Sequence, residues 1–213
     1  MKLKAYSADG SEAGEKEVAG FPTFDDDKGV DALRQAILAI RANRRQGNAS
    51  TKNRAEVSGS GKKLYRQKGL GAGRVGDKRA GQRRGGGIAF GPKPRSFNQK
   101  VNRKVKRLAL ARALFEGADE GRLALIDEWK VEQPKTKLFV QVIDKVVPDS
   151  KRVLIVDDAF SDDFGLAARN VSRVALGRAQ DLNPLDLATA ENVVFSTKAL
   201  DVLLAKLGEE SAS

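Results

Sequence analysis

The stretch RVLIVDD, residues 152–158, holds four consecutive apolar residues between charged ones. A run of this length and type predicts a strand that is buried on both faces. Three more runs have the same character: RLALIDE (122–128), SRVALG (172–177) and NVVFST (192–197). Helical candidates lie among them at 136–147, 164–170 and 198–207. Strands that alternate with helices predict an α/β fold, with a mostly parallel sheet covered by helices.

Two regions upstream of these strands also have the patterns of folded structure. Residues 1–19 predict two short strands joined by a turn near Asp9 and Gly10. Three aspartates at 25–27 precede a run with helical periodicity over 30–40, and Gly47 is placed to take the left-handed cap after it. Residues 101–115 predict a second helix, with apolar residues on two sides.

A basic segment separates these two helices. From residue 41 to residue 107 there are 21 Lys and Arg residues but only two acids, Glu56 and Asp77, so this segment carries a net charge of +19. Twelve of the 21 glycines also lie there, and the rest of the chain is mildly acidic. The sequence therefore predicts a globular α/β domain formed by residues 1–47 and 99–213, with residues 48–98 as a long, extended basic loop inserted after the first long helix.

Composition excludes several classes of site. The chain has no cysteine and no histidine, which excludes zinc fingers, disulfides, thiol nucleophiles and imidazole bases. No run approaches 18 apolar residues, and the N-terminus lacks the apolar centre of a signal peptide. We therefore expect a cytoplasmic protein with no membrane contact, no metal and no cofactor.

Three substrings resemble catalytic motifs but lack the necessary context. Gly71, Gly73 and Gly76 match a dinucleotide fingerprint, yet glycine and charged residues flank them where a strand and a helix are required. SGSGKK (58–63) departs from a phosphate-binding loop at two positions. VLIVDD resembles the first strand of a phospho-receiver domain, but no later strand ends in an acceptor aspartate.

The basic segment is better explained as a nucleic-acid-binding element than as a solvated charge run. Tyr65 and Phe90 can stack on unpaired bases, and the cations can neutralise phosphates. Prolines and aromatics interleaved with the charges have no use in a purely solubilising tail. An insertion of this length, doubled back on itself, could reach up to about 80 Å at roughly 3.3 Å per residue.

The predicted RNA-binding residues are the cations and two aromatics of this segment and its flanks. They are Arg44, Arg45, Lys52, Arg54, Lys62, Lys63, Tyr65, Arg66, Lys68, Arg74, Lys78, Arg79, Arg83, Arg84, Phe90, Lys93, Arg95, Lys100, Arg103, Lys104 and Arg107.

Several motifs, taken in order, carry a family resemblance. RQGNASTKNRAEVSGSGKKLYRQKGLGAGR (45–74) and RRGGGIAFGPKPR (83–95) are followed by KVNRKVKRLALARAL (100–114), PKTKL (134–138) and LAARNV (166–171). Together they resemble the family of the universal fourth protein of the bacterial large ribosomal subunit. The resemblance implies a structural protein that binds large-subunit ribosomal RNA and supports early assembly. It also implies a loop that threads to the wall of the nascent-peptide exit tunnel, near its constriction, beside another loop-bearing ribosomal protein.

The resemblance also implies which residues form the tunnel-facing tip. These are Gly61, Lys62, Lys63, Leu64, Tyr65, Arg66, Gln67, Lys68 and Gly69. Residues 83–87 and 90–95 would form an arm packed in RNA. The chain departs from the family pattern at Leu64 and Tyr65, where Pro-Trp is common, and at Leu70 and Ala72, where Thr and Arg are common.

A function of a different class is an α/β enzyme that modifies nucleic acid and grips its substrate with the basic loop. Such an enzyme needs acids, bases or metal ligands that converge at the carboxyl ends of the strands. The candidates are Asp127, Glu128, Asp157 and Asp158, and the sequence does not show whether they converge. The family resemblance favours the structural, non-catalytic function.

Overall fold

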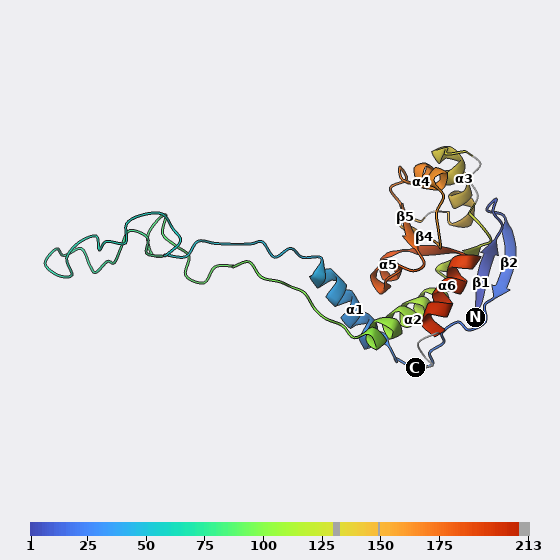
Figure 1. The fold of residues 1–213 in the computed structure, drawn as a ribbon, viewed down its shortest axis with the longest axis horizontal. Coiled ribbons are helices and arrows are strands. Elements are labelled where there is room, and N and C mark those ends of the chain that lie inside the picture. Colours follow the sequence, from blue (N-terminus) through green and yellow to red (C-terminus); the bar gives the residue numbers. More distant parts are fainter. Residues whose placement is uncertain (130–132, 149, 209–213) are drawn as a thin grey trace. The chain divides into compact units, whose positions relative to one another are not determined.

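The structure, a computed structural model, describes residues 1–129, 133–148 and 150–208. Six strands and six helices form within these residues, and Figure 1 shows their arrangement. In chain order they are β1 (Lys2–Tyr6), β2 (Glu12–Glu17), α1 (Val30–Asn43), α2 (Arg103–Asp119), β3 (Leu123–Ile126), α3 (Thr136–Val146), β4 (Val153–Asp157), α4 (Asp162–Ala168), β5 (Val174–Arg178), α5 (Pro184–Thr189), β6 (Asn192–Ser196) and α6 (Thr197–Gly208).

The strands form one mixed sheet with the order β2-β1-β3-β6-β4-β5. Only β1 and β2 are antiparallel, as a hairpin, and every other neighbouring pair is parallel. In the centre, β6 pairs with β3 on one side, where Leu125 lies opposite Phe195, and with β4 on the other, where Ile155 lies opposite Val194. The predicted α/β fold with a mostly parallel sheet is confirmed.

Alternate residues of the central strands enter two separate cores. Leu154 and Val156 of β4 join one core with residues of α1, α2, α5 and α6, whereas Val153 and Ile155 join a second core with α3 and α4. Successive side chains of a strand point to opposite faces of the sheet, so helices cover both faces. This explains why the strands are continuous apolar runs in the sequence.

The short helix α5 was not among the helices that the sequence predicted. It begins at Pro184, and the side chain of Asn183 accepts hydrogen bonds from the backbone N–H groups of Leu185 and Asp186, at 3.0 and 3.2 Å. An Asn cap followed by Pro in the first turn is a usual way to begin a helix. With only six residues, α5 is too short to have a recognisable apolar period.

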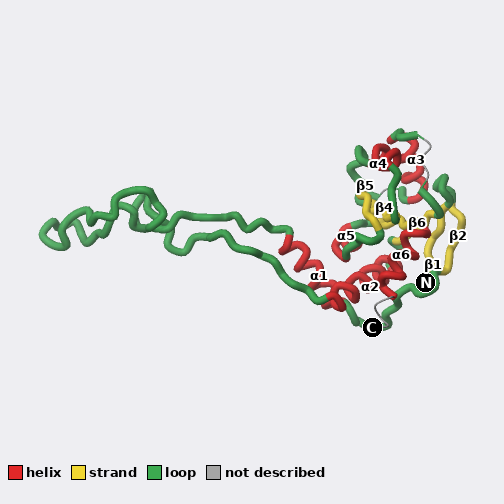
Figure 2. Tube along the Cα trace, viewed as in Figure 1, coloured by secondary structure: helices red, strands yellow, loops and turns green. Residues whose placement is uncertain are grey.

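The chain divides into two compact units, one formed by Met1–Ile40 with Lys100–Ser213 and the other by Arg41–Gln99. We call the first the domain and the second the loop. From residue 44 to residue 102 the chain forms turns and bends but neither helix nor strand, as Figure 2 shows. Neither hydrophobic core includes any residue of the loop.

The predicted role of Gly47 as the cap of the first helix is wrong. Helix α1 ends at Asn43, before Gly47 is reached. Gly47 does adopt a left-handed conformation, with φ of +69°, but a Cβ at this position would lie 2.0 Å from the carbonyl oxygen of Arg95. A glycine is needed there because the two ends of the loop approach each other closely.

Replacing residues 48–98 with a short Gly-Ser linker should leave a domain that unfolds cooperatively. The linker has only a short gap to close, because Arg95 N–H donates to the Gly47 carbonyl at 3.2 Å and Gln99 N–H donates to the Asn43 side chain at 2.7 Å. Neither core loses a residue, so thermal unfolding followed by circular dichroism should show a single transition near that of the full chain. A broad, non-cooperative transition would show that the loop contributes to the cores.

Candidate nucleic-acid interface

The loop doubles back on itself, so a first arm, residues 44–64, runs antiparallel to a second arm, residues 76–99. Backbone hydrogen bonds join the arms at Arg95 to Gly47 (3.2 Å), Thr51 to Pro92 (2.9 Å), Ile88 to Lys52 (2.9 Å) and Leu64 to Gly76 (3.0 Å), with the N–H donor named first in each pair. Their register is irregular: Thr51 and Lys52 are adjacent, whereas their partners Pro92 and Ile88 are four residues apart. The bonds therefore make no regular β-ladder, which agrees with the absence of strands from the loop.

Residues 65–75 form the apex between the arms. The Tyr65 hydroxyl donates to the carbonyl of Ala72 at 3.2 Å and so closes the apex across its base. Gly71 and Gly73 have positive φ values of +65° and +71°, with no neighbouring atom near the position of a Cβ, so they serve to turn the chain. No strand precedes these glycines and no helix follows them closely, so the substring is not a dinucleotide fingerprint.

Two glycines of the RRGGG motif are required by contacts inside the loop. A Cβ on Gly87 would lie 2.2 Å from the backbone nitrogen of Arg54 in the first arm. A Cβ on Gly86 would lie 2.0 Å from the carbonyl oxygen of Ala80. These distances are far shorter than any carbon contact can be, so both positions allow only glycine without a rearrangement. The motif therefore packs the loop against itself.

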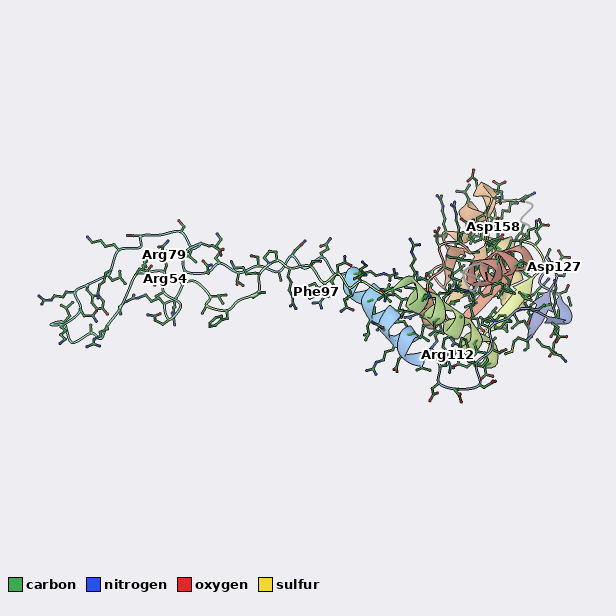
Figure 3. All side chains as sticks on the ribbon, turned by 60° about the horizontal axis from the view of Figure 1, so that its bottom comes forward. Arg54, Arg79, Phe97, Arg112, Asp127 and Asp158 are labelled. Atoms are coloured by element: carbon green, nitrogen blue, oxygen red, sulfur yellow. The ribbon has the colours of Figure 1, made fainter. Side chains whose placement is uncertain are left out.

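Asp77 is buried within the loop, with 1% of its surface exposed. Its Oδ2 atom accepts a hydrogen bond from Nε of Arg54 at 3.0 Å, and Nε of Arg79 lies 3.5 Å away. Arg79 also donates from Nη1 to the carbonyl of Val57 at 3.2 Å. Figure 3 shows Arg54 and Arg79 close together on the loop. The carboxylate of Asp77 thus contacts one arginine from each arm.

Glu56, the other acid of the loop, forms an exposed ion pair between the two arms. Its Oε2 atom pairs with the ammonium group of Lys93 in the second arm and accepts a hydrogen bond from the N–H of Asn53 at 2.9 Å. The hydrogen bond from Lys93, followed by that from Asn53, lowers the pKa of the Glu56 carboxyl below its ordinary value. Both side chains of this ion pair are exposed to solvent, so the pair adds little stability.

Near the ends of the loop, two predicted RNA-binding arginines lie on an aromatic ring. The guanidinium of Arg45 is 3.6 Å from the centre of the Phe97 ring, and that of Arg95 is 4.4 Å away. Figure 3 marks Phe97 in this position. Cation–π contacts at such distances favour a charged group on the ring face. They fix the two side chains where the arms meet α1.

Comparison with known proteins identifies the family. Residues 22–206 match the family described as "Ribosomal protein L4/L1 family". The chain belongs to this family. Membership confirms the resemblance drawn from the sequence motifs, and it makes the chain a structural protein of the ribosome rather than an enzyme.

Individual bacterial relatives match over most of the chain. A protein from Oenococcus oeni named "Large ribosomal subunit protein uL4" is 40% identical over 207 residues, which cover 97% of this chain and 99% of the relative. Proteins with the same name are 41% identical in Staphylococcus haemolyticus, over 90% of this chain and 91% of the relative, and 44% identical in Nostoc punctiforme, over 79% and 81%. Each match extends through the loop and beyond it into the domain.

Within the family member described here, the predicted RNA-binding cations fall into three groups. Arg45, Arg54, Arg79, Lys93 and Arg95 are engaged by Phe97 or by the two acids of the loop. A second group is exposed on the loop and forms no ion pair there: Arg44, Lys52, Lys62, Lys63, Arg66, Lys68, Arg74, Lys78 and Arg84. The third belongs to the domain, where Lys100, Arg103 and Lys104 are exposed and Arg107 donates to the carbonyl of Leu207.

Of the remaining predicted residues, Arg83 is partly buried and Phe90 is fully exposed. The Nε atom of Arg83 is shielded from solvent. Phe90 has a relative exposure of 104%, and its neighbour Ile88 is 53% exposed. A large aromatic side chain that is fully exposed contributes no buried surface to the stability of the chain itself. The residues assigned to the tip extend from the end of the first arm into the apex, and all except the half-buried Tyr65 are exposed.

The four acids on which the enzyme alternative depended lie around one hollow of the domain. Asp127, Glu128, Asp157 and Asp158 follow the carboxyl ends of β3 and β4 and line a space of about 340 Å³. Figure 3 marks Asp127 and Asp158. The sequence could not show this convergence, because it depends on the order of strands in the sheet.

Two of the four acids in this hollow are bonded to neighbouring groups. Asp157 Oδ1 accepts from the Ser196 hydroxyl at 2.6 Å and from the N–H of Asp158 at 2.8 Å. Glu128 pairs with Lys198 at 3.5 Å. Among the described residues, no group of three or more acids is arranged to hold a metal ion. Likewise, no helix in the described part of the chain is long and apolar enough to cross a membrane.

Proposed function

We propose that this chain is a structural constituent of the large ribosomal subunit, and that its loop binds and penetrates large-subunit ribosomal RNA. The observation that carries the proposal is the set of nine predicted RNA-binding cations that are exposed on the loop and engaged by neither an acid nor Phe97, together with membership of a ribosomal protein family. Like charges this close together repel one another unless a polyanion neutralises them. A phosphate backbone supplies that charge, and the release of its counterions favours binding.

The exposed apolar side chains of the loop support RNA as the partner. Phe90 can stack on an unpaired base, and Ile88 can pack beside it. RNA offers unstacked bases in its loops and bulges, whereas duplex DNA keeps its bases stacked. A purely electrostatic contact with any polyanion would not use a fully exposed Phe.

We further propose that residues 61–69 line the nascent-peptide exit tunnel near its constriction. This segment has four cations, one aromatic residue and one amide. Lys63 bonds to Gln67, Arg66 to the carbonyl of Gly69 at 3.3 Å, and Tyr65 to the carbonyl of Ala72 at 3.2 Å, but none of the four cations pairs with an acid. A water-filled passage through RNA can solvate such side chains and supply phosphates. The partners would be ribosomal RNA, neighbouring ribosomal proteins including the other loop-bearing protein at the constriction, and the nascent peptide.

The remaining parts of the proposal concern assembly and location. A protein that threads a loop through folded RNA must join the subunit before that RNA closes around it, which favours a role in early assembly. Such a protein works in the cytoplasm, on the ribosome. The four acids do converge at the domain hollow, as a nucleic-acid-modifying enzyme would require. Against that alternative, Asp157 is bonded to Ser196 and to the N–H of Asp158, Glu128 pairs with Lys198, and the chain belongs to a ribosomal protein family.

RNA binding should depend strongly on salt and on the loop. If the loop neutralises six to ten phosphates, affinity for deproteinised large-subunit RNA should fall by about 10³ to 10⁵ between 50 and 200 mM salt. Filter binding or fluorescence anisotropy measures this slope, and the chain with residues 48–98 replaced by a linker is the control. An equal slope with and without the loop would contradict the proposal.

Replacing Phe90 with Ala should weaken RNA binding with little change in its salt slope. Loss of one base stack costs about 1–3 kcal/mol, which is roughly 5- to 150-fold in affinity. Phe90→Tyr should keep the affinity because it keeps the ring, and Phe90→Leu should lose most of it although it keeps apolar volume. Equal binding by the Leu and Tyr variants would show that stacking is not the interaction.

Deleting residues 64–68 should alter the tunnel while subunits still assemble. The rest of the loop would still anchor the protein, so the expected changes are in the passage of stalling peptides and in the binding of tunnel-blocking drugs. Deleting residues 84–88, which include the tightly packed Gly86 and Gly87, is the matched control and should reduce assembly instead. Sucrose-gradient profiles and drug footprinting distinguish the two. If the first deletion blocked assembly, this segment would be an anchor and not the tip.

A further inference from the structure

Helix α1 carries the chain from the domain toward the first arm, but it buries few large apolar side chains. Leu33 and Ala36 are its buried members of a hydrophobic core, whereas Val30 and Leu38 are 37% and 53% exposed. Hydrophobic stabilisation is roughly proportional to the apolar area removed from water, so core packing alone holds α1 weakly. Contacts outside the core therefore help to fix the position of this helix.

Residues 21–29, which we call the strap, run directly into α1 and lie against α2. Phe21 is buried in the same core as Leu33. A Cβ on Gly29, which has a φ of +95°, would lie 3.2 Å from the Cβ of Arg112 on α2. The carbonyl of Gly29 also accepts a hydrogen bond from the N–H of Leu33 at 2.8 Å, in the first turn of α1. The strap thus meets α2 at the point where α1 begins.

Arg112 joins the strap to α2. Its Nη1 atom donates to the carbonyl of Asp26 in the strap at 2.7 Å, and its Nε atom donates to Glu116 Oε1, one turn along α2, at 2.8 Å. The Phe24 ring packs edge-on against the Phe115 ring, with centres 5.7 Å apart, and the Arg112 guanidinium lies 5.7 and 5.4 Å from these two centres. Such distances allow cation–π attraction. Figure 3 marks Arg112 on the domain.

The charge of Arg112 is occupied within the domain. Its side chain is 12% exposed, and a carbonyl and a carboxylate accept hydrogen bonds from its guanidinium. A planar guanidinium suits this place because it can lie on aromatic rings and donate in two directions, whereas an ammonium group is a compact point charge. Arg112 therefore differs from the exposed cations of the chain, whose charge is available to phosphates.

We propose that Arg112 is a positioning residue for RNA binding, because it holds the strap on α2 and so fixes where α1 begins. This role presupposes that the chain binds RNA as proposed above. The side chains that it positions are the exposed cations of the two helices, Arg34 on α1 and Arg103 and Lys104 on α2. Cations on one rigid base lose less freedom on binding than cations on two helices that move independently.

Replacing Arg112 with Gln in the full chain should weaken binding to deproteinised large-subunit RNA about tenfold, as measured by fluorescence anisotropy. The matched control is Arg169→Gln, which removes the same charge from an exposed position at the end of α4. This control should change the affinity by less than about twofold, because solvent and salt screen an exposed charge that does not touch RNA. Phe24→Ala should also bind more weakly, although it leaves the net charge unchanged.

Two acids in and next to α2 separate positioning from electrostatics. Glu116→Ala and Glu120→Ala each remove one negative charge, so electrostatics alone predicts equal or tighter RNA binding for both. Glu116 holds Arg112, whereas Glu120 pairs with Arg122. The positioning role therefore predicts weaker binding by Glu116→Ala and equal or tighter binding by Glu120→Ala.

Hydrogen exchange and thermal unfolding show whether a variant has lost the strap contact or the whole domain. In Arg112→Gln the amide of Leu33, which bonds to Gly29, should exchange faster, while amides of the central strands β3, β4 and β6 keep their protection. A single thermal transition above the temperature of the binding assay shows that the domain is folded. If Arg112→Gln does not fold, Phe24→Ala and Glu116→Ala decide.

Weaker RNA binding by folded Arg112→Gln, Phe24→Ala and Glu116→Ala, with both controls near the wild type or tighter, supports the inference. Equal affinities of Arg112→Gln and Arg169→Gln overturn it, because the strap contact would then serve stability alone. Tighter binding by Glu116→Ala overturns it too, and so does weak binding by Arg112→Gln alone, which would mean that the guanidinium itself contacts RNA. Equal binding by the wild-type chain and the chain without its loop would instead contradict the proposed function, and that comparison involves none of these variants.

Discussion

A segment that carries a net charge of +19 over 67 residues repels itself, and this repulsion governs the rest of the molecule. Such a segment cannot be part of a hydrophobic core, so the chain places both cores in the domain. It also cannot hold a defined shape unless ion pairs and hydrogen bonds within it oppose the repulsion. Within the loop, Asp77 and Glu56 form ion pairs with cations, the Phe97 ring contacts an arginine, and glycines allow the arms to approach closely. We propose that an external polyanion neutralises the charge that remains.

The domain has both hydrophobic cores, and we predict that it folds without help from the loop. Its sheet is covered on both faces, and its central strands are apolar throughout. The crevice at the carboxyl ends of those strands is where α/β enzymes place their chemistry. Here Asp157 bonds to a serine and a backbone N–H, and Glu128 pairs with a lysine. The same fold can carry unrelated functions, so the crevice alone does not make an enzyme. We propose that the function lies with the charged loop, as membership of a ribosomal protein family supports.

The sequence was sufficient for the fold but not for the interior of the loop. The strands β3, β4, β5 and β6 could be predicted because a strand buried on both faces must be apolar at every position, and the longer helices because their apolar period is visible.

The helix α5 was missed because six residues show no period, although Asn183 and Pro184 were a usable signal. The role of Gly47 was assigned to the wrong contact because its partner, Arg95, is distant in sequence. For the same reason the burial of Asp77 could not be foreseen; a lone acid among cations was the only hint. The convergence of Asp127 and Asp157 depended on strand order, which local patterns do not contain.

The central proposal is that the loop binds ribosomal RNA as two paired arms. A high-resolution structure of the large ribosomal subunit that contains this chain tests it most directly. We expect the arms to pair within RNA as they do here, with Thr51 bonded to Pro92, Ile88 bonded to Lys52, and Arg54 on a buried Asp77. Arms separated by RNA, with Asp77 facing nucleotides or solvent, would contradict the account.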